Sequence, residues 1–280
     1  MVRIITDSAA DFEPFELQEK NILCIPIRVH LGQQEYEENI NMSKDQFYGL
    51  LAETGETPKT SQPAPAYLAD LFAEAKAAGE EAVYFTLSSA LSGTYQTACM
   101  TREDAESDAC FVVDSKNPTG GQRLLVEYAV RLRDAGKSAA EIVAAVESIR
   151  DKIVLYACID TLEYLYRGGR ISQTVYKLGT LAQVKPIIRV TEEGAIEVPA
   201  KAMGMRKGRD MLCKQLEQKK PSPEHNLYVM YTADRTNGEA LAKKIRDMGY
   251  DVPDSRIINV GAGIGSHIGP NACGIVYVEA

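Results

Sequence analysis

Apolar positions in the first half of the chain follow two different periods. Short runs rich in β-branched residues, typical of buried strands, occur at residues 2–5, 24–31, 82–87 and 110–113. Stretches whose apolar positions repeat at helical spacing occur at residues 13–20, 43–53, 66–78, 93–105 and 120–135. Strands that alternate with helices tend to pair in parallel, with helices on both faces of the sheet. We therefore expect residues 1–152 to form an N-terminal α/β domain around a parallel sheet.

The second half of the chain has more strands and fewer helices between them. Strand-like runs occur at residues 153–159, 182–190, 196–202, 227–231, 256–260 and 274–278. Helical periodicity is clearest at residues 205–218 and 237–248. Glu192, Glu193 and Gly194 separate two of the strands and predict a hairpin turn. We therefore expect residues 153–280 to form a C-terminal α/β domain with a mixed sheet.

Polar side chains follow three of the predicted N-terminal strands, at the edge where ligands bind in open α/β sheets. The alternative is helix capping, because Asp and Ser are favoured at helix starts. The residues for which we favour capping over ligand contact are Asp7, Asp11, Asp114 and Ser115.

Composition narrows the class of protein. The hydrophobic fraction of 45% is that of an ordinary globular chain. No apolar stretch approaches the roughly 18 residues of a membrane span, and Asp7 comes too early for a signal peptide. The six cysteines form no C-x-x-C pair and the three histidines no cluster, so we expect no metal site and place the protein in the cytoplasm.

Charge is distributed unevenly. The net charge of -8 argues against binding nucleic acid over the whole surface. Between Tyr164 and Lys214, however, the sequence contains ten Lys and Arg residues but only four Asp and Glu residues. Such a basic stretch is either a solvated face or the surroundings of an anionic ligand or acidic partner.

A proline-rich segment supplies the first candidate site. Thr60 and Ser61 follow Pro58 and precede Pro63 and Pro65, so two hydroxyls lie in a stiffened loop just before a predicted helix. Free amides at a helix start favour an anion there. The alternative is a plain helix cap with proline in the first turn.

The second candidate lies where a strand turns into a helix. Ser92 and Thr94 present hydroxyls at the positive end of the predicted helix, and Gly93 lets the backbone approach a ligand closely. This arrangement suits a carboxylate or a phosphate. A capped helix in a structural turn is the alternative.

The third candidate is His267, which four glycines surround in residues 261–269. The glycines predict unusual backbone conformations or close approach, and the imidazole could donate to a carboxylate and gain a raised pKa from it. The alternative is a structural buried histidine. The G-x-G-x-G spacing is no dinucleotide fingerprint, and Ser266 lacks the flanking glycines of a nucleophile elbow.

Arg170 is the fourth candidate. It follows Gly168 and Gly169, which end a short apolar helix. Its guanidinium could be fixed near a ligand or a partner phosphate. A basic residue at the negative end of a helix is the alternative.

Together these segments are similar to the DegV family. The motifs that carry the resemblance are T-D-S-A-A-D at residues 6–11, T-S-Q-P at 60–63, S-S-x-L-S-G-T-Y-Q at 88–96, Y-L-x-x-G-G-R-I at 164–171, K-P at 185–186 and I-G-x-H-x-G-P at 264–270. They span nearly the whole chain. Asn271 departs from the family pattern, which usually has glycine there.

The resemblance implies a long-chain fatty acid in a tunnel near the junction of two α/β domains, with no other cofactor. It further implies that the carboxylate is held by Thr60 or Ser61, by Ser92 with the Gly93 and Thr94 turn, and by His267. Some relatives present the lipid to a fatty acid kinase, and Arg170 would then face that partner.

Three hypotheses about function follow. We favour a non-catalytic fatty-acid carrier, because no P-loop, nucleophile elbow or metal cluster is apparent. The alternative is a serine hydrolase that uses Ser92 with His267, with Asp7 or Asp114 orienting the ring. A nucleotide-binding or regulatory protein is disfavoured by the acidic charge and the missing motifs.

Overall fold

The computed structural model describes residues 2–105, 108–177 and 183–280, and its N-terminal half contains the predicted parallel sheet. The strands of this sheet, in the order β2-β1-β6-β7, are β1 (Val2–Asp7), β2 (Ile22–Ile25), β6 (Glu81–Thr86) and β7 (Cys110–Asp114). All three strand pairs are parallel, which confirms the prediction.

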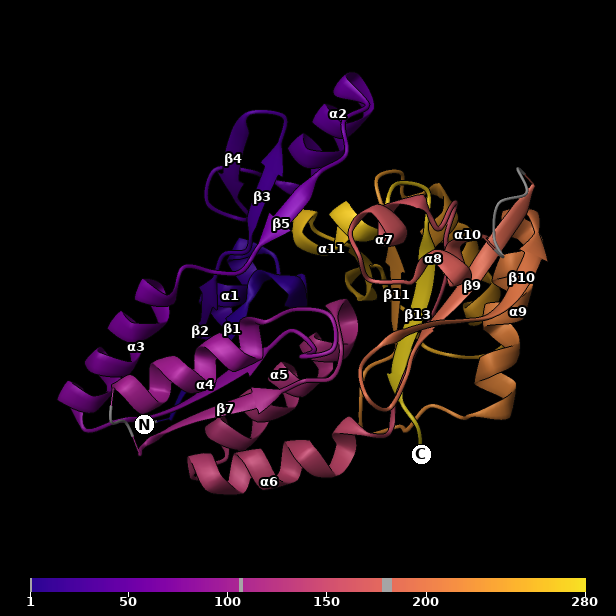
Figure 1. The fold of residues 1–280 in the computed structure, drawn as a ribbon. Coiled ribbons are helices and arrows are strands. Elements are labelled where there is room, and N and C mark those ends of the chain that lie inside the picture. Colours follow the sequence, from indigo (N-terminus) through magenta and orange to yellow (C-terminus); the bar gives the residue numbers. More distant parts are fainter. Residues whose placement is uncertain (1, 106–107, 178–182) are drawn as a thin grey trace.

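Helices cover both faces of the parallel sheet (Figure 1). They are α1 (Pro14–Glu19), α3 (Pro65–Ala78), α4 (Thr94–Asp104), α5 (Thr119–Asp134) and α6 (Ala139–Arg150). Successive residues of a strand point to opposite faces. Accordingly, Ile5 packs with Phe72 of α3 on one face, and Ile4 packs with Leu125 of α5 on the other.

The second half forms a mixed sheet of six strands in the order β10-β9-β8-β13-β11-β12, which confirms the prediction. The strands are β8 (Ile153–Cys158), β9 (Val184–Val190), β10 (Ile196–Met203), β11 (Tyr228–Tyr231), β12 (Ile257–Asn259) and β13 (Cys273–Val278). β11 and β12 are parallel and the other neighbours antiparallel. The predicted hairpin turn joins β9 to β10, with the Gly194 amide bonded to Thr191. Ala182, the first residue of the predicted 182–190 strand, lies outside the described residues.

Helices α9 (Gly204–Gln218) and α10 (Thr236–Asp247) cover one face of the mixed sheet. The opposite face meets α5, which lies between the two sheets. Leu125 belongs to the core beneath the parallel sheet, whereas Leu124 packs with Val276 of β13. At Gly120 a Cβ atom would lie 2.5 Å from Val276 Cγ1, so the absence of a side chain permits this approach. The division of the chain at residues 152 and 153 stays a prediction.

A third sheet was not predicted. The expected strand at residues 24–31 is two strands, because Pro26 has no amide hydrogen to continue the first ladder. Its second part is β3 (Arg28–Leu31), which pairs antiparallel with β4 (Gln34–Glu37) and β5 (Lys59–Ser61). This sheet and α2 (Lys44–Thr54) project from one end of the molecule (Figure 1). The candidate hydroxyls at residues 60 and 61 therefore lie on a strand rather than in a loop.

The remaining elements are short. They are η1 (Ser8–Ala10), α7 (Glu163–Arg167), α8 (Gln173–Lys177), η2 (Asp254–Arg256) and α11 (Ala262–Ile268). Within the described ranges, no helix combines the length and the hydropathy that crossing a bilayer requires.

Candidate functional site

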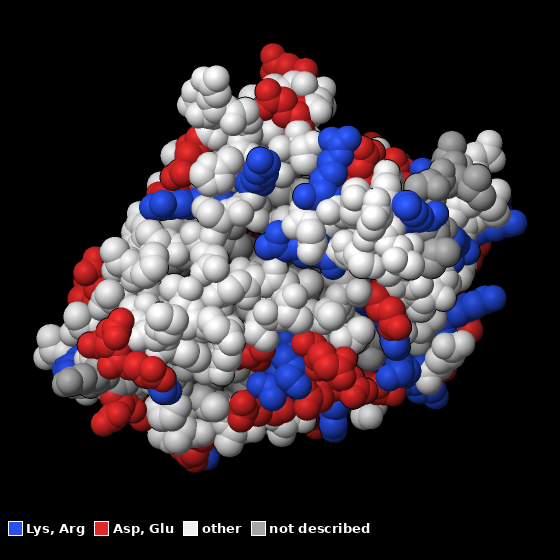
Figure 2. Space-filling model, in the orientation of Figure 1, with Lys and Arg blue, Asp and Glu red and all other residues white. Residues whose placement is uncertain are grey.

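Residues at the ends of all three sheets line a cavity of about 560 Å³. We call it the head-group cavity, and its volume is in the range usual for small-molecule sites. Its lining contains every residue that we proposed for the carboxylate: Thr60, Ser61, Ser92, Gly93, Thr94 and His267. Arg170 lines it too. Segments about 30 and 170 residues apart in the chain thus meet at one place. Figure 2 shows several Lys and Arg side chains among uncharged residues across the upper half of this face.

Thr60 lies on β5 and faces α11. Its Oγ1 atom is 2.8 Å from Nε2 of His267, and pairing of β5 with β3 fixes its position. The neighbouring Ser61 places its hydroxyl 3.2 Å from His30 instead, as expected where adjacent strand residues point to opposite faces. The helix-cap alternative is wrong for both, because α3 begins after Ala64 without a side-chain cap.

The turn before α4 brings the second pair of hydroxyls together. Ser92 Oγ and Thr94 Oγ1 are 2.9 Å apart, and the Thr94 amide reaches Ser92 Oγ at 3.4 Å. A Cβ atom at Gly93 would collide with the amide nitrogen of Gln62. Gln62 in turn accepts a hydrogen bond of 2.6 Å from Thr97 Oγ1. Close approach at Gly93 therefore joins the β5 segment to α4, a contact that sequence reasoning missed.

The glycine-rich segment around His267 is a helix, α11. Glycine is needed there mainly for close packing. A Cβ atom at Gly265 would lie 2.5 Å from Tyr48 Oη, and one at Gly261 would collide with Glu38 Oε1. Gly269, just after the helix, has a φ of 75°, which favours glycine.

His267 is largely buried and uncharged at neutral pH. Burial lowers its pKa to about 4, and the positive charge of Arg170 acts in the same direction. The raised pKa that we expected thus requires a bound carboxylate, since the protein alone shifts it the other way. His267 Nδ1 has no hydrogen-bond partner in the described structure, and a Cβ atom at Gly168 would collide with it.

Arg170 joins the Ser92 turn to the end of α7. Its Nε donates to the Leu91 carbonyl at 2.9 Å, and a second nitrogen donates to the Gly168 carbonyl. The side chain is half-buried, and burial lowers the pKa of its guanidinium. Arg170 is thus part of the cavity wall, while its partner-facing role stays a prediction.

An apolar recess of about 40 Å³ adjoins the head-group cavity. The two share Pro118, Ile196, Ile264 and Ile268 in their linings. Beyond these residues the recess runs along the inner face of the mixed sheet, against side chains such as Leu155. A ligand with a polar head and an apolar tail matches this combination of walls.

The polar residues at the strand ends make internal hydrogen bonds and do not line the cavity. Asp7 accepts from the Ala9 amide and caps η1, which confirms capping. Asp114 accepts from the amides of Ser89 and Lys116, and Ser115 donates to the Asn117 carbonyl. Asp11 differs, because it accepts at 2.8 Å from the Gly261 amide before α11. Capping is therefore wrong for Asp11, whose side chain holds a distant helix instead. It is also wrong for Asp114 and Ser115, because the N-caps of α4 and α5 are Gly93 and Pro118, without a side-chain cap.

The geometry of a serine hydrolase is not assembled in the described residues. A triad needs hydroxyl, imidazole and acid in one hydrogen-bonded series. Ser92 bonds to Thr94, whereas His267 bonds to Thr60. Neither Asp7 nor Asp114 contacts His267 Nδ1. Among the described residues, no group of three potential metal ligands occurs either.

Comparison with known proteins identifies relatives along the whole chain. A family model described as an uncharacterised protein of the DegV family matches residues 1–280. A DegV domain-containing protein of Clostridium perfringens is 34% identical over 282 residues, which cover 98% of this chain and 96% of the relative.

Solved structures share the fold. One described as showing fatty acid binding of a DegV family protein from Thermus thermophilus matches with a TM-score of 0.89 at 27% identity, covering 100% of this chain and 99% of the other. A fatty acid binding DegV family protein from Streptococcus agalactiae matches with a TM-score of 0.88 at 25% identity, with the same coverage. The arrangement of one parallel and one mixed sheet is therefore common to these proteins.

Proposed function

Because this chain belongs to the DegV family, we propose that it binds one long-chain fatty acid by its carboxylate and buries the acyl chain. Family members from Thermus thermophilus and Streptococcus agalactiae are described as binding fatty acids. The observation that carries the proposal is the convergence of the three candidate segments on one cavity that shares apolar lining residues with an adjoining recess.

In this proposal the carboxylate lies among neutral donors. The residues Thr60, Ser92 and Thr94 line the cavity, whereas the Ser61 hydroxyl lies 3.2 Å from His30 on the other face of β5. The start of α4 adds amides at the positive end of an eleven-residue helix. A neutral His267 carries one ring N–H, which donates either to Thr60 or to the ligand.

The acyl chain would occupy the apolar part of the head-group cavity and reach the recess past the residues that the two share. Burying about 14 methylenes at about 0.8 kcal/mol each contributes roughly 11 kcal/mol before the costs of binding. Each hydrogen bond to the charged head contributes only about 1.5–3 kcal/mol. The tail therefore supplies most of the affinity, and the polar groups orient the head.

We further propose that the protein presents the lipid to a fatty acid kinase that forms an acyl phosphate. Two basic residues, Arg28 and the half-buried Arg170, line the same cavity as the proposed carboxylate site. A guanidinium at this position suits a phosphate or an acidic partner surface. No observation favours the hydrolase alternative.

Native mass spectrometry tests the lipid proposal directly. The purified protein should carry a fatty acid, and delipidated protein should take up palmitate or oleate in a one-to-one ratio. The double variant Ser92→Ala, His267→Ala should bind more weakly, whereas Gly49→Ala is a matched surface control because nothing lies within 4 Å of its added Cβ. A protein that stays empty and ignores both lipids would overturn the proposal.

A further inference from the structure

Two buried carboxylates lie at the start of the helix that carries His267. Asp11 Oδ1 accepts from the Gly261 amide at 2.8 Å. Glu38 lies beside the same glycine, whose Cβ would collide with its Oε1 atom. Both acids are at most 2% exposed. We call Asp11 and Glu38 the acidic pair.

The acidic pair faces backbone groups that need partners. The first amides of a helix have no acceptor within the helix. In α11 these amides include those of Ala262 and Gly263. Both donate towards the Glu38 carboxylate and thereby lower its pKa. The positive end of the helix favours a negative group there. Gly263 permits the approach, because its Cβ would lie 3.1 Å from Glu38 Oε2.

Glu38 is itself held in place. Ser8 Oγ donates to Glu38 Oε2 at 2.7 Å and accepts from the Ile27 amide at 2.9 Å. Burial raises the pKa of Glu38, while the Ser8 hydroxyl and Lys44 lower it. Among the residues that the structure describes, Glu38 Oε1 and Asp11 Oδ2 find no hydrogen-bond partner, so the pair is buried at a cost.

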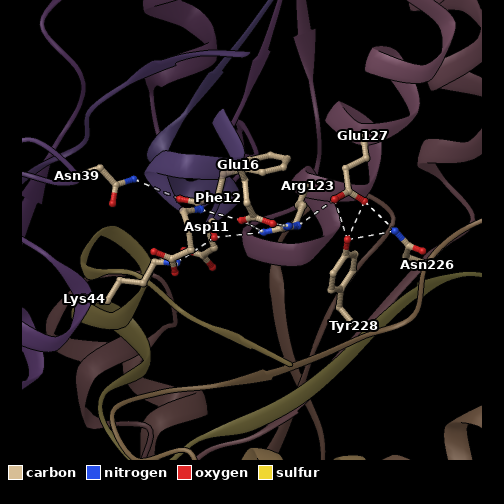
Figure 3. A network of polar contacts seen from close by, with 10 residues as sticks. Asp11, Phe12, Glu16, Asn39, Lys44, Arg123, Glu127, Asn226 and Tyr228 are labelled. Carbon is tan, nitrogen blue, oxygen red and sulfur yellow. Dashed lines mark hydrogen bonds and ion pairs between the residues drawn. The ribbon is translucent and has the colours of Figure 1, made fainter. Parts of the chain in front are cut away.

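Asp11 also connects α11 to a wider polar network (Figure 3). Its carbonyl accepts from Lys44 Nζ at 2.9 Å and from Arg123 at 3.4 Å. Arg123 continues to Glu16 and to Glu127 of α5. The start of α11 is therefore anchored to α2, η1 and α5 at one point.

We propose that Asp11 and Glu38 are positioning residues, which fix α11 so that His267 faces Thr60 and the head-group cavity. The inference rests on the proposed function in one respect, namely that His267 holds the ligand carboxylate. α11 has only seven residues, and His267 lies in its last turn. A displacement at its start is therefore carried to the imidazole, whose Nε2 lies 2.8 Å from Thr60 Oγ1.

Substitutions at Glu38 and Gly261 distinguish loss of the hydrogen-bond acceptor from a change in side-chain size. Glu38→Leu removes the acceptor at similar size, and Glu38→Gln retains one carbonyl oxygen. Gly261→Ala displaces the carboxylate while keeping every polar group; the glycine φ of -76° suits alanine. Glu81→Leu is the matched control, because Glu81 is a partly buried acid that accepts from an amide at the start of another helix, that of Ala139, and has no contact with the acidic pair.

The first readout is the pKa of the His267 imidazole in ligand-free protein, measured by NMR titration. The His267→Asn variant assigns its resonance. In the native protein its pKa should lie near 4. Glu38→Leu and Gly261→Ala should move it towards the ordinary value of 6.5, because the ring leaves its buried contact with Thr60. Glu38→Gln should restore most of the native value.

A second readout uses palmitate labelled with ¹³C at its carboxyl. The same two variants should retain the lipid but shift or broaden its carboxyl resonance. An unchanged His267 pKa in both variants would overturn the inference, as would an equal shift in Glu81→Leu. If Glu38→Leu does not fold, Gly261→Ala decides alone.

The two proposals fail in distinguishable ways. The imidazole titration needs no lipid, so it reports on the acidic pair even if no fatty acid binds. Lipid that binds normally with an undisturbed carboxyl resonance in Gly261→Ala would instead support the proposed function and remove the positioning role.

Discussion

The division of labour between tail and head predicts how affinity depends on chain length. Laurate, myristate and palmitate differ by steps of two methylenes. Each step should improve binding by about 1.6 kcal/mol, since a buried methylene contributes about 0.8 kcal/mol. This corresponds to about 15-fold in the dissociation constant per step. The slope should fall once the tail fills the head-group cavity and the recess.

His267→Ala should shift this whole series without changing its slope. One hydrogen bond to the carboxylate contributes about 1.5–3 kcal/mol, so affinity should fall by about 10- to 150-fold at every chain length. The lines should stay parallel because His267 lies at the head-group cavity and is not part of the recess lining.

Displacement of a fluorescent fatty acid, below the micelle concentration of each ligand, measures both effects. Gly49→Ala should reproduce the native series, because its added Cβ meets no atom within 4 Å. A flat dependence on chain length would refute the tail argument. A changed slope in His267→Ala would show that the histidine contacts the tail or that the cavity has rearranged.

Three further predictions follow from the charged residues. Arg170→Ala should spare lipid retention, measured by native mass spectrometry, but remove acyl-phosphate formation by a partner kinase; an empty pocket would contradict the partner-facing role. Burial raises the pKa of Asp11 to about 8 from 3.8, so this group favours folding most at low pH and progressively less as pH rises through that window. Asp11→Asn should therefore gain thermal stability relative to the native protein between about pH 4 and 8; a constant difference in melting temperature would contradict the shift. Arg123→Ala leaves Glu16 and Glu127 without their buried partner and should destabilise the fold by about 3–5 kcal/mol in urea unfolding, whereas a loss below about 1 kcal/mol would contradict this role.

The sequence predicted the two larger sheets because most of their strands are rich in apolar, β-branched residues. Strands such as Glu81–Thr86 are buried on both faces and carry a strong signal. The third sheet was missed because β4 and β5 are short and polar, with sequences QEYE and KTS. Their pairing with β3 is a tertiary contact that local pattern does not report.

The sequence predicted the separate segments of the candidate site but not how they meet. The hydroxyls near residues 60 and 92 and the histidine at 267 have local motifs, but their meeting depends on the packing of all three sheets. α11 was missed because two glycines within seven residues disfavour an isolated helix, and packing against Tyr48 and Glu38 outweighs that propensity. Asp11 and Gly261 are 250 residues apart, so no local signal could connect them.

A neutral histidine is an unusual partner for an anion, and it bears on how the proposed carrier releases its ligand. Burial and Arg170 keep the His267 pKa near 4, so the ring binds the carboxylate as a dipole and not as a full positive charge. Buried ion pairs are hard to separate, because removing one partner leaves an uncompensated charge. Hydroxyls and a neutral imidazole leave no such charge behind. A head held by neutral donors can therefore be exposed to a partner at moderate cost, while the buried tail keeps the lipid bound.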